Sequence, residues 1–286
     1  MTLTKYFYKH ATQDCKDRIA IPELDRSAYM TPQYMEMFKE ELDSIKLKGK
    51  VGLVYSNGAS FHQSEHRVCK KDYSNSLDND LPSPMAIKGL VAHMAHKYTS
   101  LFAQNDVQIN DMEIVSNTCA SSMYGIIKAK EMLDSGMDHV IVITEEKTSF
   151  DTVRIFHEHR ISVRASDGFA CAVFSKEGEG FEVSHCKKSY TYSNNPFLVT
   201  AEGYKKVYTA SDMVKGHATG TEVNDKAEYE AFGPNVIGYK AKIGHSQGSS
   251  GLLELCMVAD DIKLQGKVLC VASGLGGFYA SCVLHK

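Results

Sequence analysis

Cys119 lies where a short polar turn meets a helical pattern, in the stretch SNTCASSMYGIIKAKEMLDSG of residues 116–136. The start of a helix carries unpaired N–H groups and a partial positive charge, which lower the pKa of a thiol and can hold an oxyanion. Cys119 is therefore a candidate nucleophile. The stretch alone leaves open the alternative that it is a small buried thiol with a packing role.

Two histidines occupy turns that could complete such a site. His217 lies in KGHATGTEVNDKAE, and His245 lies in YKAKIGHSQGSSGLLE. Both turns are rich in Gly, Ser or Thr, follow apolar stretches and precede helical patterns. Turns of this kind gather at one end of an open α/β sheet and form its binding site. We therefore expect the two imidazoles and the thiol to meet there.

Buried strands and amphipathic helices must position these turns. Apolar runs rich in β-branched residues alternate with helical patterns, which predicts an α/β fold around a well-covered sheet. The predicted helices span residues 31–49, 83–102 and 120–135, and the predicted strands span residues 50–58, 113–118 and 139–144.

The second part of the chain repeats the plan of the first. A shift of 128 residues superposes SSMYGIIKAKEMLDSGMDHVIVIT on SSGLLELCMVADDIKLQGKVLCVA without a gap, so that Ser122 matches Ser250 and Val140 matches Val268. We predict one domain over residues 1–286, built from two similar halves at about 1–165 and about 166–286.

Bulk composition excludes several classes of protein. Of the 286 residues, 43% are hydrophobic and 23% charged, with a net charge of -3, so we expect no nucleic-acid partner. We also expect no membrane span and no export signal, because the apolar runs are short. The eight cysteines then indicate reduced thiols in a cytoplasmic protein. No Cys/His spacing is typical of a metal site.

Taken together, these motifs resemble the β-ketoacyl-ACP synthases of the thiolase superfamily, of the elongating Cys-His-His type, in a shortened form. TCASS resembles the nucleophile turn of that family, HATGTEVND resembles its HGTGT motif, and KAKIGHSQGSSGLLE resembles its K-x-x-x-GH-x-x-GAAG-x-x-E motif. SGLGGFYASCVL resembles the C-terminal GFGG turn and last strand. The motifs follow the family's order over residues 113–286.

The resemblance implies roles for the matching residues. Cys119 would accept an acyl group from a carrier thioester, and His217 and His245 would donate hydrogen bonds to the malonyl thioester carbonyl as it becomes an enolate. Lys240 would balance charge and orient His245, with Glu254 as its supporting partner.

Further residues would hold the substrate. The backbone N–H groups of Cys119 and Leu275 would form the oxyanion hole, and Thr219 and Thr221 would bind the phosphopantetheine arm. Two alternatives stay open at these positions. Glu254 could be an ordinary helix residue, and the threonines could simply cap the helix that follows them.

The resemblance also implies a layered αβαβα thiolase-like fold and decarboxylative Claisen condensation of a carrier-bound acyl group with malonyl-carrier, in fatty-acid or polyketide-type biosynthesis. No cofactor would be bound, since phosphopantetheine arrives on the acyl carrier protein. The expected partners are that carrier and a second ketosynthase-like chain, in a homodimer or heterodimer with HVIVIT as the sheet edge. The alternatives are a non-condensing acyltransferase and a chain-length-factor-like partner of an active synthase.

Two substitutions depart from the family pattern near the site. Leu275 replaces a gating phenylalanine, which leaves the pocket more open. Ala218 replaces the second residue of HGTGT, a glycine, and an alanine fits a tight turn without strain only where its φ is negative.

Overall fold

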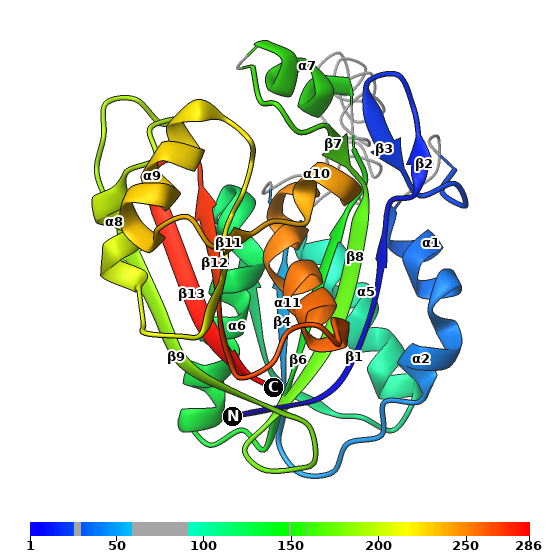
Figure 1. The fold of residues 1–286 in the computed structure, drawn as a ribbon. Helices are drawn as coiled ribbons and strands as arrows, with labels where there is room; N and C mark the ends of the chain where they lie inside the picture. Colours follow the sequence, from blue (N-terminus) through cyan, green and yellow to red (C-terminus); the bar gives the residue numbers. More distant parts are fainter. Residues whose placement is uncertain (26–29, 59–90, 149, 159) are drawn as a thin grey trace.

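The computed structural model describes residues 1–25, 30–58, 91–148, 150–158 and 160–286. Ten strands form one mixed sheet in the order β11-β10-β12-β13-β9-β1-β8-β6-β4-β5 (Figure 1). Its first five strands along the chain are β1 Thr2–His10, β4 Val51–Ser56, β5 Ile109–Val115, β6 His139–Glu146 and β8 Gly168–Ser175. Its last five are β9 Phe181–Tyr190, β10 Met213–Lys215, β11 Val236–Ile237, β12 Lys267–Gly274 and β13 Phe278–His285.

The ten strands fall into two sets with the same topology. Counted inward from each edge, the order is β5-β4-β6-β8-β1 and β11-β10-β12-β13-β9. In both sets the first three strands pair in parallel. The fourth strand pairs antiparallel with the third, and the fifth pairs antiparallel with the fourth. β6 and β12 differ by 128 residues at both ends, the shift found in the sequence. Because β8 pairs with β6 and β1, the boundary between the sets lies between β8 and β9, after the expected residue 165.

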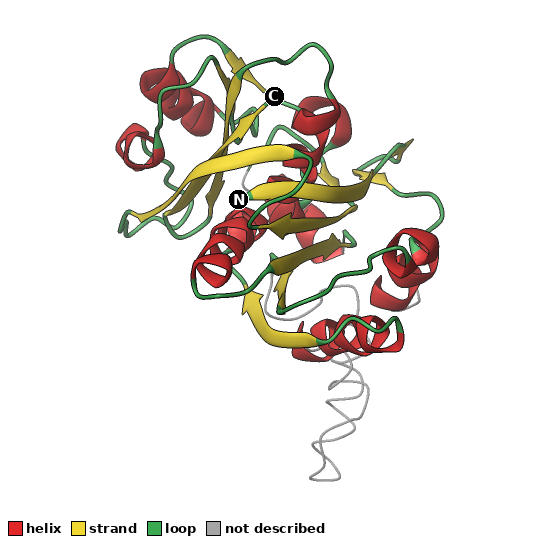
Figure 2. Ribbon diagram, turned by 90° about the horizontal axis from the view of Figure 1, so that it is seen from below, coloured by secondary structure: helices red, strands yellow, loops and turns green. Residues whose placement is uncertain are grey.

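Helices cover both faces of each set, as Figure 2 shows from below. α1, α2 and α5 pack on the outer face of the first set, and α8 and α9 on the outer face of the second. α6 and α11 lie between the two sets and share a core with both, which gives the predicted αβαβα layering. The helices are α1 Met30–Met37, α2 Lys39–Asp43, α5 Val91–Gln104, α6 Ser121–Asp134, α7 Phe150–Glu158, α8 Ala201–Val207, α9 Glu222–Phe232, α10 Lys240–Ile243 and α11 Ser250–Asp260.

Side-chain alternation on the central strands builds these layers. In β12, Val268 and Cys270 face the inner helices, whereas Leu269 and Val271 face the outer ones. The inner helices approach closely, because a Cβ on Gly251 would lie 2.9 Å from the backbone nitrogen of Met123. The sheet and this helix pair form the rigid frame that carries the turns.

Several predicted elements are confirmed, and others shift. The strands at 50–58 and 139–144 and the helix at 120–135 occur with small changes of bounds. The helix at 31–49 is divided at Phe38 and ends at Asp43, and the strand expected at 113–118 spans Ile109–Val115. The start of the helix expected at 83–102 lies outside the described residues.

HVIVIT is not the edge strand that the sequence suggested. It forms β6, which pairs with β4 on one side and β8 on the other, and Val140 to Ile143 are fully buried. An apolar run on both faces is typical of a central parallel strand. The edges are β5 and β11.

Three smaller features complete the description. A separate small sheet consists of β2 Gln13–Asp14, β3 Arg18–Ala20 and β7 Ala165–Ser166. Two short 3₁₀ turns, η1 Thr118–Ala120 and η2 Gln247–Ser249, precede the two inner helices. Among the helices of the described segments, none combines the length and apolarity needed to cross a bilayer.

Candidate active site

Cys119 is the middle residue of η1, directly before α6, as its sequence context predicts. Thr118 starts this turn with a φ of 52°, a left-handed conformation that is rare for a β-branched residue. Ser121 Oγ fixes the turn by accepting from Asn117 N at 2.8 Å and donating to Thr118 O at 2.6 Å. Cys119 is partly accessible as a residue and lines a cavity, whereas its thiol group is buried.

The end of β12 packs against the turn that carries Cys119. Thr118 Oγ1 donates to Leu275 O at 3.2 Å, and a Cβ on Gly274 would lie 2.5 Å from Asn117 O. Only a glycine lets the two backbones approach this closely. The backbone of Leu275 therefore lies beside the Cys119 turn, as an oxyanion hole formed by their two N–H groups requires.

His217 follows the short strand β10, in a turn held by a buried carboxylate. Glu228 of α9 accepts hydrogen bonds from the backbone N–H groups of His217 and Ala218. The φ of Ala218 is 50°, so the condition under which an alanine fits this turn without strain is not met. The two bonds to Glu228 hold the alanine in a conformation that favours glycine.

His245 follows α10 and the left-handed Gly244. Its backbone N–H donates to Arg164 O at 2.8 Å, and its Nδ1 lies 3.0 Å from Ser250 Oγ. The rings of His245 and His217 have centroids 5.1 Å apart and are nearly perpendicular. If Ser250 donates to Nδ1, the Nε2 of His245 carries the ring proton.

One cavity of about 450 Å³ brings the predicted residues together. Cys119, His217, His245 and Leu275 line it, as do Thr219 and Thr221. The rest of its wall is mostly apolar and comprises Ile155, Phe156, Ile161, Asn195, Phe197, Val199, Val223, Asn224, Ser273 and Gly274. A cavity with mostly apolar walls and few polar groups suits a largely apolar ligand.

The hydroxyls of Thr219 and Thr221 lie within hydrogen-bond distance of each other at the N-terminus of α9. Thr219 Oγ1 and Thr221 Oγ1 are 3.0 Å apart. Thr221 occupies the N-cap position of α9, yet its side chain makes no capping hydrogen bond. The capping alternative therefore does not describe Thr221, and its hydroxyl stays on the cavity wall.

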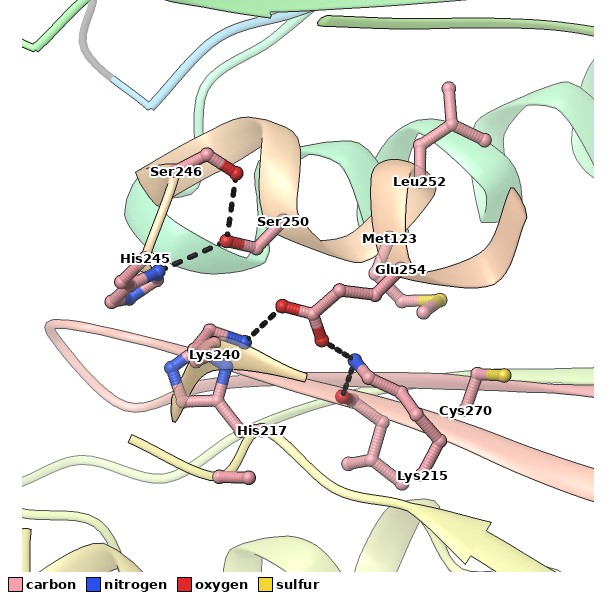
Figure 3. Close-up of polar contacts among 12 residues, drawn as sticks. Met123, Lys215, His217, Lys240, His245, Ser246, Ser250, Leu252, Glu254 and Cys270 are labelled. Carbon is pink, nitrogen blue, oxygen red and sulfur yellow. Dashed lines mark hydrogen bonds and ion pairs between the residues drawn. The ribbon is translucent and has the colours of Figure 1, made fainter. Parts of the chain in front are cut away.

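Lys240 and Glu254 do not line the cavity but lie behind the histidines, both almost fully buried. Lys240 Nζ and Glu254 Oε1 are 2.6 Å apart, so Glu254 is more than an ordinary helix residue. Figure 3 shows a second lysine, Lys215, on the other oxygen of the same carboxylate. Lys215 was not predicted from the sequence, although a lysine at the end of the short strand before His217 is an available signal.

Burial controls the protonation of the site. It raises the pKa of the Cys119 thiol to about 12, and the charge of Lys240 offsets only part of this rise. The lowered pKa expected from the helix start is therefore not found in the resting structure. Burial, helped by the charge of Lys240, also holds the pKa of both His217 and His245 well below the ordinary value. The resting site thus contains a thiol and two neutral imidazoles.

Comparison with known proteins identifies the fold. Residues 205–267 match the family model for the C-terminal domain of β-ketoacyl synthases, whereas no curated protein matches the chain. A β-ketoacyl synthase from Burkholderia phymatum STM815 superposes with a TM-score of 0.73 at 15% identity, over 94% of this chain and 88% of that chain.

Chains from two solved assemblies of a ketosynthase and a chain length factor are also similar. The ishigamide ketosynthase/chain length factor gives a TM-score of 0.71 at 13% identity, over 98% of this chain and 91% of that one. A chain from the complex of a ketosynthase with its chain length factor from Xenorhabdus doucetiae gives a TM-score of 0.68 at 12% identity, over 99% of this chain and 97% of that one. The chain therefore has the thiolase-like fold of the β-ketoacyl synthases, and its residues 205–267 match their C-terminal domain.

Proposed function

We propose that the protein catalyses decarboxylative condensation of a carrier-bound acyl group with malonyl-carrier. The observation that carries this proposal is the meeting of Cys119, His217 and His245 on one largely apolar cavity. A thiol is a soft nucleophile and a good leaving group, and two neutral imidazoles can each offer one N–H donor.

In the first step, Cys119 Sγ attacks the carbonyl carbon of the acyl thioester, and the carrier thiol leaves. Because the resting thiol is protonated, its proton must leave as the new bond forms, and it ends on the departing carrier sulfur. A neutral imidazole has a free lone pair that can relay this proton. The backbone N–H groups of Cys119 and Leu275 stabilise the oxyanion of the tetrahedral intermediate.

In the second step, the bond between the malonyl α-carbon and its carboxylate breaks, and CO₂ leaves. The electron pair of that bond stays on the thioester fragment and forms an enolate. His217 and His245 donate to the enolate oxygen, where the negative charge develops. The enolate carbon attacks the acyl group, and Cys119 leaves as a thiolate that takes up a proton from solvent. Thr219 and Thr221 hold the phosphopantetheine arm that brings malonate into the cavity.

Mass spectrometry of the carrier product tests this assignment. Acylated protein mixed with malonyl-carrier should release CO₂ and form β-ketoacyl-carrier. His217→Ala and His245→Ala should each lower the rate about 100-fold, a typical loss for a group that stabilises developing charge. Full CO₂ release in both variants would contradict the assigned roles.

The carrier protein and a second ketosynthase-like chain are the proposed partners. A solved ketosynthase that is similar to this chain is in complex with its acyl carrier protein, with a TM-score of 0.68 at 14% identity. β5 is an edge strand in the described sheet, and Met112 and Ile114 on it are exposed by 40% and 39%. An apolar edge of this kind suits pairing with another chain, so we assign it to the dimer contact.

A second candidate function is a partner subunit that resembles chain length factors. It is favoured by the raised pKa of Cys119, because a protonated thiol is a poor nucleophile. The retention of all three cavity residues favours the catalytic assignment. The two functions differ in whether Cys119 becomes acylated.

A further inference from the structure

Lys215 is a buried lysine to which the mechanism above gives no role. It is the last residue of β10 and stands two positions before His217. Its side chain is 0% exposed, forms an ion pair with Glu254 Oε2, and donates from Nζ to Val271 O at 3.3 Å. Water cannot solvate a charge at this depth, so the Glu254 carboxylate is the counter-ion that permits it.

Glu254 is shared between two ammonium groups, one on each oxygen (Figure 3). Lys215 comes from β10, Lys240 from α10 and Glu254 from α11. β10 leads into the His217 turn, whereas α10 and α11 flank the turn that carries His245. The three side chains therefore tie together the supports of both imidazoles.

A second acidic residue, Glu228, belongs to the same buried cluster. Glu228 holds the backbone of His217 and is also buried, and burial raises the pKa of its carboxyl. The two backbone bonds and the charges of Lys240 and Lys215 oppose that rise. Removing Lys215 would leave two buried carboxylates facing one lysine. The titratable groups around Lys215 are Glu254, Lys240, Glu228, His217, His245, Cys270 and Cys282.

We propose that Lys215 is a positioning residue for His217 and His245, which acts through Glu254 and supplies the second positive charge of the cluster. A positive charge beside an imidazole opposes its protonation. Lys215 contributes in this direction to the low pKa of both rings, after burial and Lys240, and for His217 also after His245. The proposal rests on the proposed condensation only for its catalytic readout.

Titration of the resting protein tests the proposal without any substrate. The pKa values of His217 and His245 are read by NMR of ¹³C-labelled histidine, with assignments from His217→Gln and His245→Gln. Lys215→Met should raise both pKa values, because it removes a positive charge beside the two rings. Lys215→Arg should leave them unchanged, as should Lys267→Met, which removes an exposed lysine from β12.

Unchanged imidazole pKa values in Lys215→Met would overturn the proposal. If Lys215→Met does not fold, Lys215→Gln replaces it with the same expected rise, because the amide still provides a donor for Glu254 and Val271 O.

A double-mutant cycle with Glu254→Gln tests whether Lys215 acts through the shared carboxylate. The rate of CO₂ release from malonyl-carrier should fall about 100-fold in Lys215→Met, as for a displaced catalytic group, with KM for the carrier little changed. The double variant should be no slower than the slower single variant. Losses that multiply would overturn action through Glu254. If the wild type releases no CO₂, the proposed function fails, whereas the titration still decides the role of Lys215.

Discussion

Cys119 illustrates two opposing effects on one thiol. The helix start and Lys240 favour the thiolate, whereas burial favours the neutral thiol, and burial dominates in the resting cavity. A substrate that enters the cavity must therefore meet a protonated nucleophile with neutral imidazoles beside it. In the proposed acylation step, a proton must therefore move as the thioester is attacked.

The reactivity of Cys119 with iodoacetamide should follow this protonation state. With a pKa of about 12, the thiolate fraction rises tenfold for each pH unit, so the alkylation rate should do the same from pH 7 to pH 10. Peptide mass mapping separates Cys119 from the other cysteines. A plateau below pH 9 would show instead that the helix start lowers the pKa, as the sequence alone suggests.

Ala218 stores strain that a single substitution should release. Its φ of 50° costs an alanine more than a glycine, so Ala218→Gly should raise the free energy of unfolding by about 0.5–1 kcal/mol. Urea denaturation measures the change. Ala210→Gly, at an exposed loop residue without a positive φ, should instead lower it slightly. Equal losses in both variants would contradict the strain at Ala218.

Contacts between elements place the reactive turn. β12 ends at Gly274 against the backbone of η1, and β6 ends at Glu146, whose Oε1 accepts from Gly58 N at 2.7 Å and Gly248 N at 3.2 Å. Two strand ends thus fix the two equivalent turns, η1 and η2, that precede the inner helices. Substitutions at either strand end should therefore displace the turns that line or adjoin the cavity.

Gly274→Ala should damage acylation at Cys119. The new Cβ would meet Asn117 O and Thr118 Oγ1 at 2.5 Å, so the nucleophile turn must shift. We expect at least a tenfold slower acylation and about 1–3 kcal/mol less stability, as for other overpacked sites. Gly136→Ala is the control, because it has a φ of 111° but open space around it. It should lose about 1 kcal/mol of stability from strain and keep its acylation rate. Equal acylation in both variants would refute the contact.

Glu146 should make stability fall as pH rises. Burial raises the pKa of its carboxyl to about 8, so the folded protein keeps this proton between pH 4.5 and 8 whereas the unfolded chain has lost it. The stabilisation is complete below pH 4.5 and is lost as pH rises to about 8, by up to about 1.4 kcal/mol per unit. Glu146→Gln should flatten this dependence in urea denaturation at pH 5, 6.5 and 8. The exposed Glu177→Gln should leave it intact, and an equal slope in wild type and Glu146→Gln would exclude this carboxyl as its source.

The whole molecule repeats one topology twice, and the sequence predicts this repeat from its 128-residue shift. The layering and the central strands could be predicted because strands that are buried on both faces appear in the sequence as continuous apolar runs. The meeting of Cys119 with the two histidines could be predicted because each lies in a small-residue or polar turn that precedes a helix. The φ of Ala218, the edge role of β5 and the sharing of Glu254 with Lys215 could not, because they depend on contacts between segments far apart in the sequence.

Assembly through β5 gives a prediction for solution behaviour. If two copies pair along this edge, the chain alone should sediment at twice its 31.7 kDa, and Met112→Lys with Ile114→Lys should return it to 31.7 kDa. Ile262→Lys, at a residue 86% exposed away from the edge, should leave the mass unchanged. A monomeric wild-type chain would contradict the homodimer and favour a different chain as partner.

The central claim is that Cys119 carries the acyl group, and intact-protein mass after mixing with an acyl-carrier thioester tests it most directly. We predict an adduct with the mass of the acyl group on the wild type and none on Cys119→Ala, followed by loss of the adduct when malonyl-carrier is added. An adduct that persists would indicate acyl transfer to another acceptor. A folded wild-type protein without any adduct would contradict the catalytic assignment and indicate a partner subunit.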